Sequence, residues 1–266
     1  MPLADTELVN PVKERINAGQ VALGMIARLA RSGDIARIAK TTGHDFIFMD
    51  GQHSLFSLET IGHIAQTALG CGIAPLVRVR SCGDPDVPVI LDNGATGIVF
   101  PDVNTAADAK RAVDACKFPP VGKRSVSGGY PVFDFRSVPI GQSSRMLNDS
   151  TLVVCMIETR EGLANVERIA AVDGVDVIHV GCNDLLTAIG KPGAFGDPEV
   201  VGAIERVIAA AAAHGKFAGL GGERDFDRQM AFIRKGVRFV TTQTDIGFLM
   251  AAAGQRTEQI RRGLGA

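Results

Sequence analysis

Two carboxylic acids occupy positions at which a divalent metal ion could be held. Glu158 follows the apolar run LVVCMI, and Asp184 follows the apolar run VDVIHV after Gly181-Cys182-Asn183. If the two runs are neighbouring parallel strands, both carboxylates lie at one end of the sheet. Two carboxylates with open positions suit a hard cation such as Mg²⁺ or Mn²⁺, with water or substrate oxygens completing the octahedron. From position alone, a second interpretation is as good as the metal site: Asp184 caps a helix and Glu158 pairs with an arginine.

Two further side chains could supply a positive charge and a proton. Arg78 ends the run APLVR, where it could hold a carboxylate or stabilise an enolate oxygen. A structural ion pair of Arg78 with Asp50 or Glu158 is an equally good interpretation. His53 follows DFIFMDGQ and could act as an acid or a base, although a lone histidine in a loop is more often solvated. No lysine ends a predicted strand, so a Schiff base is not favoured.

The remaining reactive residues are assigned structural roles. His179 lies inside an apolar run, where a hydrogen-bonded core histidine is expected. The five cysteines are interpreted as small core residues. Cys182 adjoins the candidate metal site, but no base is placed to activate it.

Short apolar runs alternate with amphipathic runs along almost the whole chain. Consecutive apolar residues indicate parallel strands covered on both faces. Strands are predicted at 21–29, 45–51, 74–80, 96–103, 152–158, 175–181, 217–222 and 238–245, and helices at 34–43, 57–70, 86–93, 105–118, 162–172, 198–214, 225–235 and the C-terminus. Glycines typical of helix ends precede the next strand at Gly43, Gly72, Gly94, Gly190, Gly215 and Gly236.

Eight such units predict an α/β fold, a single (β/α)8 TIM barrel over residues 1–266 with its chemistry at the C-terminal ends of the strands. The alternative is an open, doubly wound sheet. No G-x-G-x-x-G follows the first strand, which disfavours a dinucleotide-binding fold.

Residues 119–150 interrupt the alternation. This long connection is rich in Gly, Ser and Pro, and such loops are commonly lids, interface arms or disordered segments. Its aromatic residues, Tyr130, Phe133 and Phe135, favour an ordered loop that docks on the barrel.

The composition excludes several classes of protein. A formal net charge of −1, without long runs of one sign, calls for neither nucleic acid nor an anionic membrane as partner. Five cysteines without a C-x-x-C pair make a disulfide framework or structural zinc improbable and favour a reducing cytoplasm. The N-terminal segment has acidic residues early and no apolar core, so it is not interpreted as a secretory signal. A cytoplasmic protein is expected.

Several collinear motifs resemble those of the HpcH/HpaI family of class II pyruvate aldolases. The motifs are DFIFMDGQHS, PLVRVR, GATGIVFPDVNTAADAKRAV, PPVGKRSV and IETREGLANVERIAAVDGVDVIHVGCNDL. The resemblance covers roughly residues 20–250. It implies a divalent ion (Mg²⁺, Mn²⁺ or Co²⁺) bound by Glu158 and Asp184 and chelated by the substrate's 2-keto and carboxylate oxygens.

The resemblance also implies roles for the neighbouring residues. Arg78 matches the arginine that contacts the keto oxygen and steadies the enolate. His53, in the same segment as Asp50, matches the histidine that handles the aldol proton. Asp92 matches an aspartate that helps to orient this histidine, with a neighbouring subunit as one source.

The 2-oxo acid pocket is implied by the same comparison. The backbone from Gly181 through Cys182 and Asn183 to Asp184 would hold the substrate carboxylate, a physically good anion site at a helix N-terminus. Met156 would line this pocket where family members usually have Gln. Other departures are Gln52 for Glu, Cys182-Asn183 for Pro-Ala and Ile26 for Trp, and they leave the choice of donor and acceptor open.

The predicted function is reversible cleavage of 4-hydroxy-2-oxo acids to pyruvate (or hydroxypyruvate) and an aldehyde. An alternative is a lyase or decarboxylase that acts on another 2-oxo acid or on an acyl-CoA thioester, although Lys123, Arg124 and Arg136 are few for the coenzyme A phosphates. A non-catalytic binding barrel is a third hypothesis, which the retained polar strand ends disfavour. The family implies a homo-oligomer, a hexamer or trimer.

Overall fold

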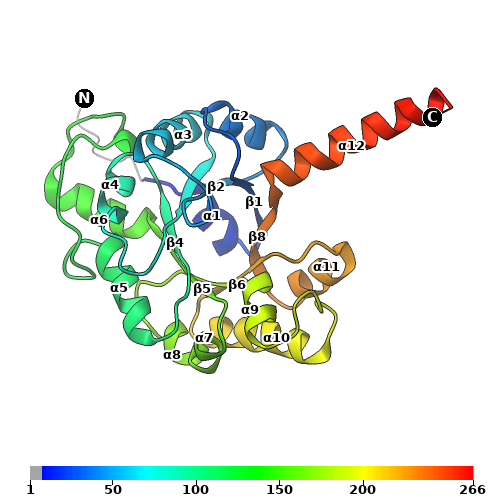
Figure 1. Ribbon diagram of the computed structural model, residues 1–266. Coiled ribbons are helices and arrows are strands. Elements are labelled where there is room, and N and C mark those ends of the chain that lie inside the picture. The colour runs from blue at the N-terminus through cyan, green and yellow to red at the C-terminus, as the bar shows by residue number, and fades with distance from the viewer. Residues whose placement is uncertain (1–7, 266) are drawn as a thin grey trace.

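Eight parallel strands form a closed barrel in the order β1 to β8 (Figure 1), in a computed structural model that describes residues 8–265. β1 pairs with β8 as well as with β2, so the sheet has no edge and the alternative of an open sheet is wrong. The strands are β1 (Ala22–Ala27), β2 (Phe46–Asp50), β3 (Ala74–Arg78), β4 (Gly97–Phe100), β5 (Leu152–Ile157), β6 (Val177–Gly181), β7 (Phe217–Gly221) and β8 (Val237–Thr244).

Helices surround the barrel, and those from α2 to α11 lie in the connections from one strand to the next. They are α1 (Pro11–Asn17), α2 (Asp34–Thr41), α3 (Leu58–Cys71), α4 (Val87–Asp92), α5 (Ala106–Cys116), α6 (Ile140–Ser150), α7 (Arg160–Ala164), α8 (Val166–Ala170), α9 (Cys182–Ala188), α10 (Pro198–Ala213), α11 (Phe226–Arg234) and α12 (Asp245–Gly263). The glycines predicted to end helices all have positive φ, as at Gly72, the left-handed C-cap of α3. The predicted (β/α)8 barrel is confirmed.

α12 differs from the other helices because it leaves the barrel and projects away from it (Figure 1). Among residues 8–265, neither α12 nor any other helix is long and apolar enough to cross a membrane.

The segment 119–150 is more regular than a loop. It contains a 3-10 turn at Pro131–Phe133 and the helix α6, which the sequence did not predict. The inner face of α6 consists of Ser143, Leu147 and Ser150, so its helical spacing carries little apolar signal. The helix predicted at 162–172 is divided into α7 and α8.

The aromatic residues of this segment behave in two ways. Tyr130 and Phe133 are buried with Phe118 and Leu147 in a separate apolar cluster, as expected of a docked arm. Phe135 is 64% exposed, so the prediction that it helps to dock the arm is wrong. Asp134 and Phe135, which follow the 3-10 turn, both have positive φ.

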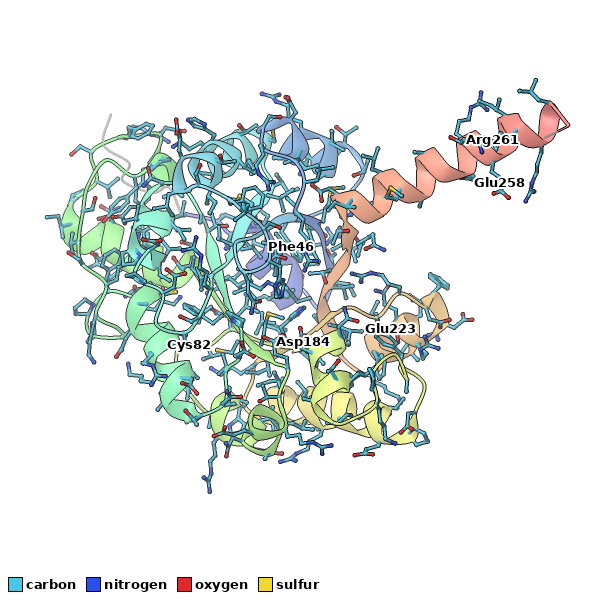
Figure 2. The ribbon with its side chains drawn as sticks, in the orientation of Figure 1. Phe46, Cys82, Asp184, Glu223, Glu258 and Arg261 are labelled. Atoms are coloured by element: carbon cyan, nitrogen blue, oxygen red, sulfur yellow. The ribbon has the colours of Figure 1, made fainter. Side chains whose placement is uncertain are left out.

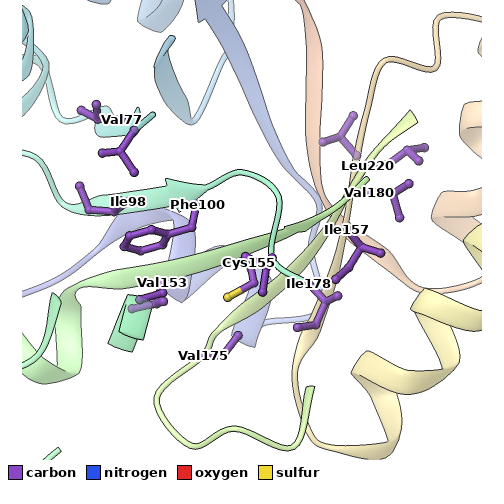
Figure 3. Packing of buried hydrophobic residues seen from close by; sticks show 14 of the residues in the cluster. Val77, Ile98, Phe100, Val153, Cys155, Ile157, Val175, Ile178, Val180 and Leu220 are labelled. Atoms are coloured by element: carbon purple, nitrogen blue, oxygen red, sulfur yellow. The ribbon is translucent and has the colours of Figure 1, made fainter. Parts of the chain in front are cut away.

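Two apolar layers hold the barrel together. One lies between strands and helices and includes Val77, Phe100, Ile157 and Ile178 (Figure 3). The other fills the barrel, where the rings of Phe46 and Phe239 stack at 4.4 Å. Buried residues of α1 join the inner layer, so this helix closes the N-terminal end of the barrel. The C-terminal ends of the strands remain open.

The inner layer predicts a large effect of Phe46→Ala. Phe46 is fully buried, and its removal leaves a cavity that the closed sheet cannot collapse. We expect the free energy of unfolding to fall by about 3–5 kcal/mol in denaturant titrations. The control Phe226→Ala removes a ring that is 72% exposed and should change stability by less than about 0.5 kcal/mol. Equal losses in both variants would contradict this packing.

Candidate active site

A cavity of about 570 Å³ lies at the C-terminal ends of the strands. Its walls include most of the residues predicted from the sequence to form a site: His53, Arg78, Met156, Gly181, Cys182, Asn183 and Asp184. Asp50 and Glu158 are buried beside it, whereas Asp92 is not part of its wall. The strand-end prediction therefore located the cavity.

Glu158 presents one unpaired oxygen in the protein interior. Its Oε1 accepts a hydrogen bond of 2.8 Å from the Asp102 backbone N–H, while its Oε2 is buried without a hydrogen-bond partner in residues 8–265. Burial raises the pKa of Glu158 to about 7, and the negative charges of Asp102 and Asp184 act in the same direction. A buried acceptor of this kind requires a cation or a proton.

Gly181 provides the space that the Glu158 carboxylate occupies. A Cβ atom on Gly181 would lie 2.4 Å from Oε2 of Glu158 and 3.0 Å from Cε of Met156. No larger residue fits here unless the carboxylate moves. The absence of a side chain at Gly181 therefore allows the Glu158 carboxylate to take its observed position.

Asp184 comes from the next strand and completes the pair of carboxylates. β5 and β6 are neighbours, and Asp184 lies in the first turn of α9 with its side chain exposed to the cavity. α9 has no side-chain cap, so the capping interpretation of Asp184 is not supported. In residues 8–265 no group of three or more His, Cys, Asp or Glu could hold a metal ion. Carboxylate oxygens such as those of Glu158 and Asp184 are the ligand type that a hard divalent cation takes, with water or substrate at its other positions.

Arg78 is held by Asp50, which ends β2 and is fully buried. Oδ1 of Asp50 accepts from Nε of Arg78 at 2.9 Å, and Oδ2 accepts from Nη2 at 2.7 Å. Oδ2 also accepts from Nε of Arg28 at 2.6 Å. Burial alone would raise the pKa of Asp50, but the hydrogen bonds and charge of Arg78, with the charge of Arg28, place it below its ordinary value.

This ion pair orients Arg78 toward the cavity. Nη1 of Arg78 is the nitrogen outside the fork, and it lies 4.0 Å from Sδ of Met156. The interpretation of Arg78 as a partner of Asp50 is therefore correct, and the one that pairs Glu158 with an arginine is wrong among the described residues. A fixed guanidinium with one free edge can contact a substrate oxygen.

Asp50 also shapes the turn that carries His53. Its Oδ1 accepts from the backbone N–H groups of Gln52 and His53, each at 3.2 Å. The His53 side chain is exposed and lines the cavity. The buried carboxylate of Asp50 thus positions both the Arg78 guanidinium and the turn that carries His53, the candidate acid–base group.

Asp92 lies apart from these residues. It is the last residue of α4, and its Oδ1 accepts from Nη2 of Arg124 at 2.5 Å. Helices of a (β/α)8 barrel run back toward the N-terminal ends of the strands, away from His53. Within one chain, the structure does not bring Asp92 to the histidine that it was expected to orient.

His179 requires a correction. It was expected to be a hydrogen-bonded core residue, yet it lines the cavity and its buried Nδ1 has no hydrogen-bond partner in residues 8–265. Its ring lies edge-on to Phe239, and burial together with the charge of Arg78 lowers its pKa to about 3. Cβ atoms on Gly219 or Gly221 would lie 2.5 or 2.7 Å from this ring. The glycines of β7 make room for a neutral imidazole.

Cys182 shows no sign of activation. It is fully buried, and burial raises the pKa of its thiol to about 12. The interpretation as a small core residue is confirmed.

Sequence reasoning missed a group of charged residues in the cavity wall: Arg28, Glu223, Arg224, Asp225 and Arg228. Arg28 directly follows β1. The segment GGERD after β7 contains Glu223, Arg224 and Asp225, and α11 contains Arg228. Figure 2 shows Glu223 and Asp184 inside the ring of helices. Extending the search of the strand ends two positions past Gly222 would have found Glu223 and Arg224.

A family model described as HpcH/HpaI aldolase/citrate lyase matches residues 28–252. The chain belongs to this family. The 4-hydroxy-4-methyl-2-oxoglutarate aldolase of Chaetomium globosum is 40% identical over 249 residues, which is 92% of each chain. The 2-keto-3-deoxy-L-rhamnonate aldolase of Escherichia coli O157:H7 is 31% identical over 257 residues, 96% of this chain and 95% of that protein.

Solved structures agree with this assignment. The HpcH/HpaI aldolase of Desulfitobacterium hafniense superposes with a TM-score of 0.89 and 28% identity, covering 94% of this chain and 96% of that one. The citrate synthase SbnG superposes with a TM-score of 0.86 and 26% identity, covering 96% and 98%. Together with the aldolases among the relatives, they confirm the predicted family and the prediction of an aldolase-type lyase.

If Glu158 binds a divalent ion, as predicted from the sequence, the contact between Gly181 and Glu158 means that Gly181→Ala weakens metal binding. The added methyl group must displace the carboxylate, and a misplaced ligand neighbour typically costs about 10- to 100-fold in metal affinity. Titration of Mn²⁺, followed by electron paramagnetic resonance, measures the change. Gly202→Ala, on α10 with open space around it, is the matched control and should bind as the unmodified protein does. Unchanged affinity in Gly181→Ala would refute this role.

Proposed function

We propose that this protein is a divalent-metal-dependent aldolase that reversibly cleaves 4-hydroxy-2-oxo acids to pyruvate, or hydroxypyruvate, and an aldehyde or related carbonyl compound. The observation that carries the proposal is the unpaired, buried Oε2 of Glu158, which lies beside a cavity lined by Asp184 and Arg78. Glu158 and Asp184 would hold Mg²⁺, Mn²⁺ or Co²⁺. The ion would supply positive charge for the oxyanion that develops on the 2-oxo group.

Arg78 and the α9 turn bind the 2-oxo acid. Nη1 of Arg78 donates to the 2-oxo oxygen, so its charge assists the enolate when the carbon–carbon bond breaks. Backbone N–H groups between Gly181 and Asp184 receive the carboxylate. Met156, which contacts Arg78 and lines the cavity, faces the methyl or hydroxymethyl end of the donor.

His53 moves the proton of the 4-hydroxyl group. In cleavage it takes this proton, a C4 carbonyl forms, and the electrons of the C3–C4 bond pass into the enolate. Protonation of C3 then yields pyruvate. In synthesis the same group returns the proton to the alkoxide at C4. The exposed position of His53 at the cavity suits this exchange, and Asp50 fixes the turn that carries it.

We propose that the active form is a homo-oligomer, a trimer or hexamer, in the cytoplasm. α12 leaves the barrel and exposes Leu249, Met250 and Ile260, which are 58%, 68% and 49% exposed. Apolar side chains on a projecting helix are typical of contact surfaces. Asp92, remote from its own His53, would serve the histidine of a neighbouring subunit.

The coenzyme A alternative is less well supported. Arg124, one of the few basic residues considered for the phosphates, is buried and paired with Asp92. Its guanidinium also lies over the rings of Phe118 and Tyr130. It therefore has a structural role in the chain.

Metal dependence is the first test. Glu158→Ala and Asp184→Ala should lose Mn²⁺ binding and aldol cleavage, each measured after removal and return of the metal, yet keep the far-ultraviolet circular dichroism of the unmodified protein. Neither side chain belongs to the apolar core, so we expect both variants to fold. Glu167→Ala, on the outer surface, is the control. Full activity in excess chelator would overturn the assignment.

The role of His53 separates two reactions. Aldol cleavage needs a base for the hydroxyl proton, whereas decarboxylation of oxaloacetate gives the same enolate without one. A positioned acid–base group contributes about 10²–10⁴-fold. We therefore expect His53→Ala to lose most aldol turnover but keep most decarboxylation, while Glu158→Ala loses both. His63→Ala, exposed on α3, is the matched control. Equal losses of both activities in His53→Ala would mean that His53 only holds structure or substrate.

A further inference from the structure

Two buried polar side chains lie deep in the cavity, where the proposed contacts with the metal and the 2-oxo acid do not use them. His179 of β6 is 2% exposed and Thr241 of β8 is 1% exposed, yet both line the cavity. Nδ1 of His179 and Oγ1 of Thr241 have no hydrogen-bond partner in residues 8–265. Polar groups buried without partners cost free energy, so this pair requires a polar ligand.

Gly221 keeps a space open between the two side chains. A Cβ atom on Gly221 would lie 2.7 Å from Nε2 of His179 and 2.8 Å from Oγ1 of Thr241. Both polar atoms therefore border the same space, and a single ligand oxygen can reach both. Within the described part of the chain, the Thr241 hydroxyl does not bond to the imidazole. The position between them is left for a ligand.

The imidazole of His179 presents one N–H group to this space. Burial and the charge of Arg78 lower its pKa to about 3, so the ring is neutral and carries a single proton. Nδ1 faces Gly219, where a Cβ atom would lie 2.5 Å away, and Gly219 is not part of the cavity wall. A proton on Nδ1 would be a buried donor without an acceptor. A proton on Nε2 faces Gly221 and the cavity, so this tautomer is favoured.

The same pair lies beside the part of the cavity that receives C3 of the donor. His179 pairs with Met156 in the register of β5 and β6, and Met156 contacts Arg78. In the proposed function the 2-oxo oxygen meets Arg78 and the carboxylate meets the start of α9, which leaves C3 toward Met156. A hydroxyl group on C3 can accept from Nε2–H of His179 and donate to Oγ1 of Thr241. A methyl group can do neither.

We infer that His179 and Thr241 bind a hydroxyl group on C3 of the 2-oxo acid donor. The inference rests on the proposed aldolase function and narrows its substrates to 3,4-dihydroxy-2-oxo acids. Cleavage of the C3–C4 bond then yields hydroxypyruvate and an aldehyde. His53 takes the proton of the 4-hydroxyl group, the electrons of the bond pass into the enolate, and C3 is protonated. His179 stays neutral throughout and determines specificity.

Hydroxypyruvate and 2-oxobutanoate test this inference apart from catalysis. They differ only on C3, where the first has a hydroxyl group and the second has a methyl group of similar size. Calorimetric titration in Mg²⁺ should show tighter binding of hydroxypyruvate. A hydrogen bond between neutral groups corresponds to about 2- to 10-fold in affinity, so the two bonds predict a preference of about 10-fold.

Thr241→Val removes the hydroxyl group but keeps the branched shape of the side chain. Because Oγ1 has no partner among the described residues, we expect this variant to fold, to lose most of the preference and to bind 2-oxobutanoate at least as well. His179→Leu should also lose the preference, whereas His179→Gln places an N–H donor near the position of Nε2 and should retain part of it. Thr151→Val is the matched control, because Thr151 is 3% exposed, directly precedes β5 and does not line this cavity.

Equal affinities of the unmodified protein for the two acids would overturn the inference and leave the aldolase proposal intact. A preference that survives in Thr241→Val and His179→Leu would do the same. A water molecule that stays between His179 and Thr241 in a crystal structure with bound hydroxypyruvate would also overturn it. If neither acid binds in Mg²⁺, and pyruvate does not bind either, the aldolase proposal itself is wrong.

Discussion

The buried ion pair between Asp50 and Arg78 is the constraint on which the rest of the site depends. Asp50 has no exposed surface, so its charge requires the hydrogen bonds that Arg78, Arg28 and the following turn supply. Removing one partner of such a pair commonly costs about 3–5 kcal/mol, because the other charge stays buried. These contacts join β1, β2 and β3 at their C-terminal ends. Asp50 thus both stabilises the barrel mouth and orients Arg78, the candidate catalytic arginine.

The polar part of the barrel interior also depends on glycines, which have no side chain. Gly181 leaves room for the Glu158 carboxylate, and Gly219 and Gly221 leave room for the His179 ring. Below this level the barrel is filled by rings such as Phe46 and Phe239. The barrel interior therefore changes from packed apolar rings to closely packed polar groups. The change occurs at the level of Gly181, Gly219 and Gly221.

The sequence predicted the fold well because parallel strands produce consecutive apolar residues that are easily recognised. Glu158 and Asp184 were found because they end adjacent strands. Arg224 was missed because it lies beyond a strand end, in a loop whose path periodicity does not determine. α6 was missed because two serines occupy its buried face. The contact of Asp92 with Arg124 rather than with a histidine depends on tertiary packing, which no spacing along the chain reveals.

Strand order explains how opposite charges coexist in one small cavity. β1 and β5 are four positions apart in a closed ring of eight strands, so Arg28 and Glu158 begin on opposite walls. Oε2 of Glu158 has no hydrogen-bond partner among the described residues, whereas Arg28 on the opposite wall is paired with Asp50. If the order of the strands were permuted so that β1 and β5 were neighbours, Arg28 and Glu158 could pair and neutralise each other. The closed order of the strands keeps them apart, so the buried oxygen of Glu158 stays available to a cation.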